Sequence, residues 1–251
     1  MDSILIEIKD KIAFLKLNRP DKLNSFNTEM AKKLQSYLDD CNSNPEVNCI
    51  VITGEGKAFC AGQDLQEAIG DNAPSIDSIV RNTYNPIIQK IQNNDKPVIA
   101  MVNGVAAGAG ANIAFACDIV IASENSSFIQ AFSKIGLVPD SGGTFFLPRL
   151  VGAKAMALML TGDKLPASEA ERINLIYKSV PHEQLLNATL EIANKISAMS
   201  PTAMKLTKKL VQATWSNSLD EQLLMEEQYQ KMAGDSPEYI AGVNAFLNKS
   251  K

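Results

Sequence analysis

The sequence predicts an α/β fold with a helical C-terminal part. Three patterns support this prediction: a hairpin of alternating residues at the N-terminus, buried strands that alternate with helices in the middle, and a nearly continuous helical pattern from about Gly143 onward. At 251 residues, with 45% apolar and 21% charged residues, the chain can bury a large core. We expect one domain with at most a small appendage.

The first third of the chain predicts a hairpin, a helix and a strand. Residues 4–8 and 12–17 alternate apolar and polar side chains around a turn of charged residues. Asn27 is a good cap for a helix that runs to about Asp40. A buried strand follows at 49–53, and a further helix is expected over roughly 75–93.

The middle of the chain adds three more strands around a helix. These strands are expected at 98–102, 118–122 and 127–130, and an apolar helical stretch runs to Cys117. Strands and helices that alternate at this spacing predict right-handed crossovers and a largely parallel sheet.

The C-terminal part is expected to be helical. Ser200 caps a helix that has proline at its first position, and two more helices are expected at 218–232 and 236–247. We place the boundary between a core, 1–195, and a C-terminal helical region, 196–251. A lysine cluster in this region reads as a solvated helix face; it comprises Lys205, Lys208 and Lys209.

Charge and composition disfavour several function classes. A net charge of −4 lacks the basic excess that nucleic-acid or anionic-membrane binding requires. The N-terminus has no signal-peptide pattern, and the longest apolar stretch is interrupted by Asn103, Asn112 and Asp118. We therefore expect a cytoplasmic protein that binds neither nucleic acid nor membrane.

Cysteine and histidine usage argues against a metal site. The four cysteines show no CxxC spacing, and the chain has one histidine, His182, which is expected to be a surface residue at a helix start. A Ser-His-Asp triad is disfavoured for the same reason. We expect no metal, and chemistry from carboxylates and backbone groups.

Two loops of small residues follow strands, at 59–65 and 103–111. Glycines there let a ligand approach the backbone N–H groups, and ligands of open α/β sheets bind beyond the carboxyl ends of the strands. The second loop enters a helix, whose N-terminus favours negative charge. Taken alone, the AGAG pattern is also explained by tight helix-strand packing, and no dinucleotide or P-loop motif is present.

Five ordered motifs give these loops a context, and in order and spacing they resemble the enoyl-CoA hydratase/isomerase (crotonase) superfamily. The motifs are NRPDKLNSF, TGEGKAFCAGQDL, KPVIAMVNGVAAGAG, CDIVIAS and FSKIGLVPDSGGTFFLPRLVG. Together with YNP at 84–86 and EYIAGVNAFL near the end, they look most like the branch that isomerises ring-1,2-epoxyphenylacetyl-CoA in aerobic phenylacetate breakdown. The resemblance implies a crotonase-like ββα superhelix core with a helical C-terminal trimerisation region.

The resemblance also implies roles for individual residues. The two backbone N–H groups of an oxyanion hole fall on Gln63 and Ala109. Pre-aimed donors of this kind stabilise the negative charge that appears when a proton is removed beside a thioester carbonyl. Coenzyme A and substrate contacts are implied for Lys22, Leu23, Ala61, Asp64, Leu65, Gly108, Phe246 and Lys249.

The positions of the two glutamates of family hydratases are occupied here by Asn112 and Phe132, neither of which can act as a general base. Of the other acids between 100 and 160, Asp118 reads as a turn or cap and Glu124 as an exposed turn. Asp140 lies where family isomerases carry their acid/base, although its local sequence also fits an N-cap for the helix near Gly143.

The resemblance therefore implies an acyl-CoA isomerase in which Asp140 moves a proton, acting on 1,2-epoxyphenylacetyl-CoA, on cis-3-enoyl-CoA, or on both. The alternatives are an enoyl-CoA hydratase that uses Asp140 alone, and a non-catalytic fold relative that binds acyl-CoA or RNA. Coenzyme A belongs to the substrate, so no separate cofactor is expected. Family analogy implies a homotrimer or a dimer of trimers.

Overall fold

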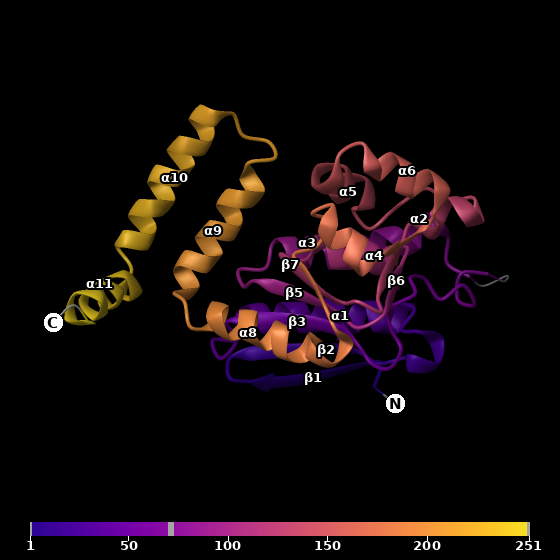
Figure 1. Cartoon of the computed structure of the whole chain (residues 1–251), viewed down its shortest axis with the longest axis horizontal. Coiled ribbons are helices and arrows are strands. Elements are labelled where there is room, and N and C mark those ends of the chain that lie inside the picture. The colour runs from indigo at the N-terminus through magenta and orange to yellow at the C-terminus, as the bar shows by residue number, and fades with distance from the viewer. Residues whose placement is uncertain (1, 70–72, 250–251) are drawn as a thin grey trace.

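The computed structural model describes residues 2–69 and 73–249, which form two sheets surrounded by helices (Figure 1). The larger sheet has the order β1-β2-β3-β5-β7-β10, with bounds β1 Ile4–Lys9, β2 Ile12–Leu17, β3 Cys49–Gly54, β5 Val98–Val102, β7 Ile119–Ser123 and β10 Lys178–Val180. The smaller has the order β4-β6-β8-β9, with bounds β4 Ala58–Cys60, β6 Val105–Ala107, β8 Ser127–Ile129 and β9 Lys164–Pro166. In the larger sheet β1 and β2 pair antiparallel and the strands from β2 to β10 pair parallel, as the sequence predicts.

Helices cover these sheets and extend beyond them. The α-helices are α1 Thr28–Ser43, α2 Ile76–Ile79, α3 Asn85–Gln92, α4 Ala109–Ala116, α5 Gly143–Val151, α6 Lys154–Thr161, α7 Ala167–Arg172, α8 Leu185–Ser197, α9 Pro201–Ala213, α10 Leu219–Gly234 and α11 Pro237–Lys249. A π-helix, Val80–Tyr84, joins α2 to α3, and short 3-10 helices lie at Pro20–Lys22, Ala131–Ile135 and His182–Gln184.

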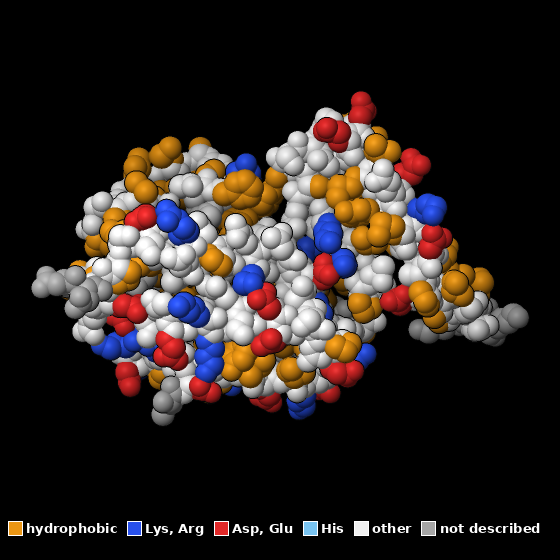
Figure 2. All heavy atoms as spheres, turned by 180° about the vertical axis from the view of Figure 1, so that it is seen from behind, with side chains coloured by type: hydrophobic (Ala, Val, Ile, Leu, Met, Phe, Trp, Pro, Cys, Tyr) orange, Lys and Arg blue, Asp and Glu red, His pale blue; other side chains and the backbone are white. Residues whose placement is uncertain are grey.

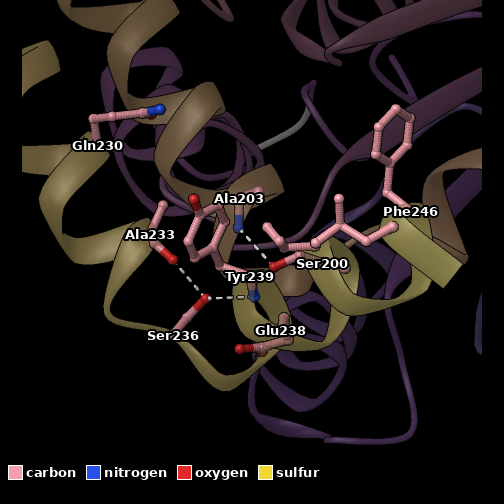
Figure 3. A pocket seen from close by; sticks show the side chains of 11 residues that line it. Ser200, Ala203, Gln230, Ala233, Ser236, Glu238, Tyr239 and Phe246 are labelled. Atoms are coloured by element: carbon pink, nitrogen blue, oxygen red, sulfur yellow. Dashed lines mark hydrogen bonds between the residues drawn. The ribbon is translucent and has the colours of Figure 1, made fainter.

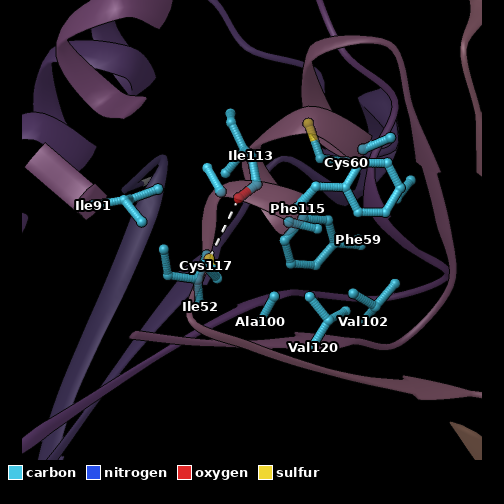
Figure 4. Close-up of a cluster of buried hydrophobic side chains, with 14 of the residues drawn as sticks. Ile52, Phe59, Cys60, Ile91, Ala100, Val102, Ile113, Phe115, Cys117 and Val120 are labelled. Carbon is cyan, nitrogen blue, oxygen red and sulfur yellow. Dashed lines mark hydrogen bonds between the residues drawn. The ribbon is translucent and has the colours of Figure 1, made fainter. Parts of the chain in front are cut away.

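The strands of the larger sheet bury side chains on both faces, which explains their nearly continuous apolar sequences. On one face Cys49 and Val51 pack with Leu185 and Ala193 of α8. On the other face alternate residues, such as Ile52, enter the main core with α4 and β4. Figure 4 shows this second layer, in which strand residues lie beneath the aromatic rings of Phe59 and Phe115 and the side chains of Ile113 and Cys60.

Most long elements lie where the sequence predicts them. The Asn27 side chain accepts a hydrogen bond from the Met30 N–H at 2.9 Å, so it caps α1 as expected, and Ser218 forms a capping box with Glu221 at the start of α10. The strands β4, β6, β9 and β10 are not predicted from the sequence. Each has three residues and is defined by its pairing partner more than by a periodic pattern.

The helices α9, α10 and α11 extend to one side of the core (Figure 1). The prediction of a solvated lysine face on α9 is wrong for Lys208, whose side chain is 7% exposed and lies 2.8 Å from Asp118 Oδ2. Lys208 Nζ also donates to the Ile91 carbonyl at 2.9 Å, so this residue fastens α9 to the core. Lys205 and Lys209, with side chains 40% and 42% exposed, fit the prediction.

His182 is exposed at the start of its 3-10 helix, which confirms its surface position. In the described ranges, no helix combines the length and apolar character that crossing a bilayer requires.

Candidate active site

The two glycine-containing loops leave the carboxyl ends of β4 and β6, which are adjacent parallel strands of the smaller sheet. The loops contact each other closely: a Cβ on Gly62, where φ is +93°, would lie 3.0 Å from the Ala107 carbonyl oxygen and 3.6 Å from the Ala109 nitrogen. A Cβ on Gly110 would lie 2.4 Å from the Cys60 carbonyl oxygen. Glycine is therefore required for this approach, which brings Gln63 beside the start of α4.

The N–H groups of Gln63 and Ala109 do not take part in the hydrogen bonds that their neighbours form. A short parallel bridge uses the groups on either side of Gln63: Phe26 N–H donates to the Gly62 carbonyl at 2.7 Å, and Asp64 N–H donates to the Phe26 carbonyl at 2.8 Å. Ala109 is the first residue of α4, so its N–H has no carbonyl one turn earlier to bind. Within the described residues neither N–H donates to a backbone carbonyl. Both are available to a ligand oxygen.

The Gln63 side chain is held by Tyr84, a contact that the sequence did not predict. The Tyr84 hydroxyl donates to Gln63 Oε1 at 2.5 Å. Burial raises the pKa of the Tyr84 phenol well above its ordinary value, and the nearby acidic groups Cys60 and Asp140 add to the shift. The phenol therefore stays protonated and remains a donor. The sequence signal was the YNP triplet, which marked this position without giving its role.

Asp64, predicted to contact substrate, is bound to its own chain. Its Oδ2 lies 2.8 Å from the Arg19 guanidinium, and its Oδ1 accepts from the Gln66 N–H at 3.2 Å. Burial would raise the pKa of this carboxyl, but the hydrogen bonds from Arg19 and Gln66 and the Arg19 charge outweigh it, so the pKa lies below its ordinary value. Asp64 thus ties the first loop to the segment before α1.

The other residues predicted to contact coenzyme A or substrate lie around the two loops. Leu23 and Leu65 are exposed, and Lys22 Nζ donates to the Gln66 side chain at 2.8 Å. Ala61 N–H donates to the Leu23 carbonyl at 3.0 Å, so these two predicted positions are neighbours. Gly108 precedes α4 with φ 53° and ψ −125°, and its N–H donates to the Ile129 carbonyl at 2.8 Å.

The two C-terminal residues predicted to contact coenzyme A, Phe246 and Lys249, do not lie beside these loops within one chain. Phe246 lies on α11 and lines a hollow of about 470 Å³ between α9, α10 and α11 (Figure 3). Ser236, at the turn before α11, receives a hydrogen bond from the Tyr239 N–H at 3.3 Å in the same hollow. Lys249 is the last residue of α11, and its side chain lies outside the described part of the chain. In Figure 1, α11 lies at the left end of the molecule and β6 lies in its right half.

Asp140 lies in the turn that enters α5, and its carboxyl group is partly buried. Desolvation raises the pKa of this carboxyl, although the Ser141 hydroxyl donates to Oδ1 at 2.8 Å and acts in the opposite direction. The N-cap interpretation is wrong, since α5 is capped by Gly142 and no side chain takes part. Asp140 instead contributes its backbone carbonyl, which accepts from the Gly143 N–H at 2.9 Å. Its carboxylate therefore takes no part in capping α5.

The two positions where family hydratases carry glutamate are both buried. Asn112, on α4, donates from Nδ2 to the Asp140 carbonyl oxygen at 2.8 Å. The Phe132 ring lies 3.7 Å from where a Cβ on Gly108 would be, so it covers the second loop. The Asp118 carboxylate accepts from the Val98 N–H and pairs with Lys208, two distant contacts that the predicted turn or cap role did not include. Glu124 is exposed in a turn, as predicted. Among the acids between 100 and 160, Asp140 is the one held against α4.

Comparison with known proteins agrees with this geometry. The model of the enoyl-CoA hydratase/isomerase family matches residues 7–251. The chain belongs to this family. The 1,2-epoxyphenylacetyl-CoA isomerase of Escherichia coli K12 is 42% identical over 99% of this chain and 97% of that protein.

Other family members are nearly as similar. A probable enoyl-CoA hydratase of Rhodobacter capsulatus is 40% identical over 98% of this chain and 95% of that protein. The crystal structure of an enoyl-CoA hydratase from Bacillus anthracis superposes with a TM-score of 0.93 at 31% identity, over 99% of this chain and 97% of that one. The chain is thus an enzyme of the enoyl-CoA hydratase/isomerase family with the crotonase fold.

Proposed function

We propose that this family member is an acyl-CoA isomerase. The thioester oxygen accepts hydrogen bonds from the N–H groups of Gln63 and Ala109, and Asp140 takes a proton from one carbon of the acyl chain and returns it to another. The observation that carries the proposal is the pairing of a desolvated Asp140 with a buried amide and a phenyl ring at the two glutamate positions.

The chemistry follows from these groups. Loss of the proton beside the thioester carbonyl places negative charge on the oxygen, and each pre-aimed donor is typically worth about 10²–10³ in rate. For a cis-3-enoyl-CoA, the proton leaves C2 and is returned to C4, which gives the trans-2-enoyl-CoA with no net gain or loss of atoms. A single carboxylate can do both steps, and its raised pKa moves it towards the range in which proton transfer is efficient.

The epoxide substrate is the first choice because the isomerase of Escherichia coli is 42% identical to this chain and carries that substrate in its name. This choice would place the enzyme in phenylacetate breakdown. The exposed side chains of Lys22, Leu23 and Leu65 would receive coenzyme A, and the C-terminal positions Phe246 and Lys249 would cover its adenine end from another subunit of a trimer or a dimer of trimers.

The second candidate is an enoyl-CoA hydratase, which the name of the Rhodobacter relative favours. It requires a water to be held and deprotonated while the α-carbon is protonated. Within this site Asp140 would have to supply both functions, because Asn112 and Phe132 supply neither.

The deciding experiment is a product assay on the wild type and on Asp140→Asn. Each protein receives cis-3-enoyl-CoA, trans-2-enoyl-CoA and 1,2-epoxyphenylacetyl-CoA in separate reactions. We expect isomerised product without 3-hydroxyacyl-CoA from the wild type, and a loss of at least about 10²-fold in the variant. Full isomerase activity in Asp140→Asn would refute the catalytic role of Asp140, and 3-hydroxyacyl-CoA as the main product would establish the hydratase.

A further inference from the structure

Two buried side-chain amides and one backbone carbonyl behind the site are joined by two hydrogen bonds. Gln130 Nε2 donates to Asn112 Oδ1 at 2.8 Å, and Asn112 Nδ2 donates to the Asp140 carbonyl oxygen at 2.8 Å. Asn112 is completely buried and Gln130 is nearly so. The pair therefore connects α4 and the residue after β8 to the backbone of the turn that carries Asp140.

The orientation of both amides is dictated by the last acceptor. A backbone carbonyl can only accept, so Asn112 must present its NH₂ group to Asp140 and its oxygen to Gln130. Gln130 must then present its own NH₂ group to Asn112. Gln130 Oε1 is left buried, and among the described residues it has no hydrogen-bond partner. A buried acceptor without a hydrogen-bond partner lowers the stability of the fold, so glutamine at position 130 is not selected for stability alone.

The turn that is held has an unusual backbone. Ser141 has φ 51° and Gly142 has φ 73°, so two successive residues adopt left-handed conformations. Such a conformation is unfavourable for serine and persists where the surroundings impose it. A Cβ on Gly143 would lie 2.3 Å from Asn112 Nδ2, so the turn rests directly on the asparagine.

We infer that Asn112 and Gln130 are positioning residues, and that their amide relay fixes where the Asp140 carboxylate stands relative to the oxyanion loops. Asn112 is suited to this task by its place on α4, whose first residue is Ala109. One helix thus carries an oxyanion donor at its start and the support of the proton carrier one turn later. This inference rests on the proposed function.

The relay predicts a specific kinetic signature. Without it the Asp140 turn relaxes, and a displacement of about 1 Å can cost about 10² in rate. The environment of the carboxylate changes as well, so the acid limb of the pH–rate profile moves. Because exposure to water removes the desolvation that raises the Asp140 pKa, we expect the limb to move to lower pH.

The test compares Asn112→Leu and Gln130→Leu with a matched control, Asn94→Leu. Asn94 is also a buried amide with two backbone contacts, to the Leu38 carbonyl at 3.2 Å and from the Lys96 N–H at 3.0 Å, but it does not contact the Asp140 turn. Gln130→Leu removes the unpaired Oε1 but takes away the donor to Asn112 Oδ1, so one buried unpaired acceptor replaces another and the melting temperature should change little. For each protein kcat, KM, the pH–rate profile and the melting temperature are measured.

We expect kcat to fall at least tenfold in Asn112→Leu and Gln130→Leu, with KM within about threefold and the acid limb shifted, while Asn94→Leu changes the melting temperature alone. A wild-type kcat and pH profile in Gln130→Leu would overturn the relay, whether or not Asn112→Leu folds. Asp140→Asn is measured in the same series: if it retains activity, the proposed function fails, whereas its inactivity beside an unaltered Gln130→Leu refutes the relay alone.

Discussion

The loops around Gln63 and Ala109 differ from the C-terminal helices in how their side chains are accommodated within one chain. Around Gln63 the polar side chains have partners within the chain, through the Arg19–Asp64 ion pair and the Tyr84 hydroxyl. The helices α10 and α11 instead leave large apolar side chains exposed, including Leu219, Leu223, Leu224, Ile240 and Phe246. In Figure 2 hydrophobic side chains gather on these helices beside a notch that separates them from the core.

In the proposed mechanism the N–H donors of Gln63 and Ala109 must stay aimed at a developing charge, which requires fixed neighbours, and these neighbours are supplied within one chain. Extended apolar surface on isolated helices is typical of faces that bind another protein surface. This contrast fits the proposed trimer, in which the C-terminal helices lie between subunits.

The largest expected effect is on kcat, and it comes from alanine substitution at Gly108. A second glycine with the same backbone conformation distinguishes the effect of backbone strain from the effect of lying beside Ala109. Gly108 and Gly152 share nearly the same backbone angles, with φ 53° and ψ −125° in the first and φ 57° and ψ −130° in the second. Alanine at either position is strained by roughly 1–3 kcal/mol. Gly108→Ala should also turn the Ala109 N–H away, so kcat should fall by about 10²–10³.

Gly152→Ala is the control, because nothing lies within 4 Å of its added Cβ and it ends α5 away from the loops. It should lose stability while keeping nearly full kcat. Steady-state kinetics and thermal melts of both variants give the result. An equal loss of kcat in the two would mean that strain alone, and not donor geometry, lowers activity.

The second effect concerns the attachment of the C-terminal helices. Lys208→Met would leave Asp118 without its cation in a poorly exposed site, which should lower the free energy of unfolding by about 3–5 kcal/mol. Lys209→Met is matched in residue type and helix, but its ion pair with Asp95 is 3.4 Å long and exposed, so the loss should stay below about 1 kcal/mol. Denaturant titrations measure both, and equal losses would contradict a special role for Lys208.

The smallest expected effect tests whether the Tyr84 hydroxyl helps to position the Gln63 N–H. Tyr84→Phe removes the hydroxyl that holds Gln63 Oε1, at a cost of about 1 kcal/mol, which corresponds to about fivefold in kcat/KM if the Gln63 N–H shifts with its side chain. Tyr177→Phe, at an exposed tyrosine, should leave kcat/KM unchanged. An unaltered kcat/KM in Tyr84→Phe would show that the Gln63 backbone is fixed without its side chain.

The sequence was sufficient where a pattern repeats or a cap is local. Asn27 and Ser218 cap their helices as expected, and the parallel strands are recognisable from continuous apolar runs. The motif resemblance located Gln63 and Ala109, whose N–H groups the structure leaves available.

What the sequence did not reveal depends on contacts between distant residues. Tyr84 reaches Gln63 across 21 positions, and Lys208 reaches Asp118 across 90, so neither partner follows from local spacing. Asp140 looked equally suited to capping α5, and the structure excludes that role because Gly142 occupies the cap. The three-residue strands β4 and β6 lie in segments that the sequence predicts as loops, because their pairing with each other is what defines them.

The unused N–H groups of Gln63 and Ala109 also have a spectroscopic consequence. An amide proton without a protein acceptor reports directly on whatever oxygen arrives. In a backbone amide NMR spectrum these two resonances should move together when a thioester analogue binds, and their exchange with solvent should slow. They would report on binding at these two groups even in Asp140→Asn, where we expect turnover to be much slower.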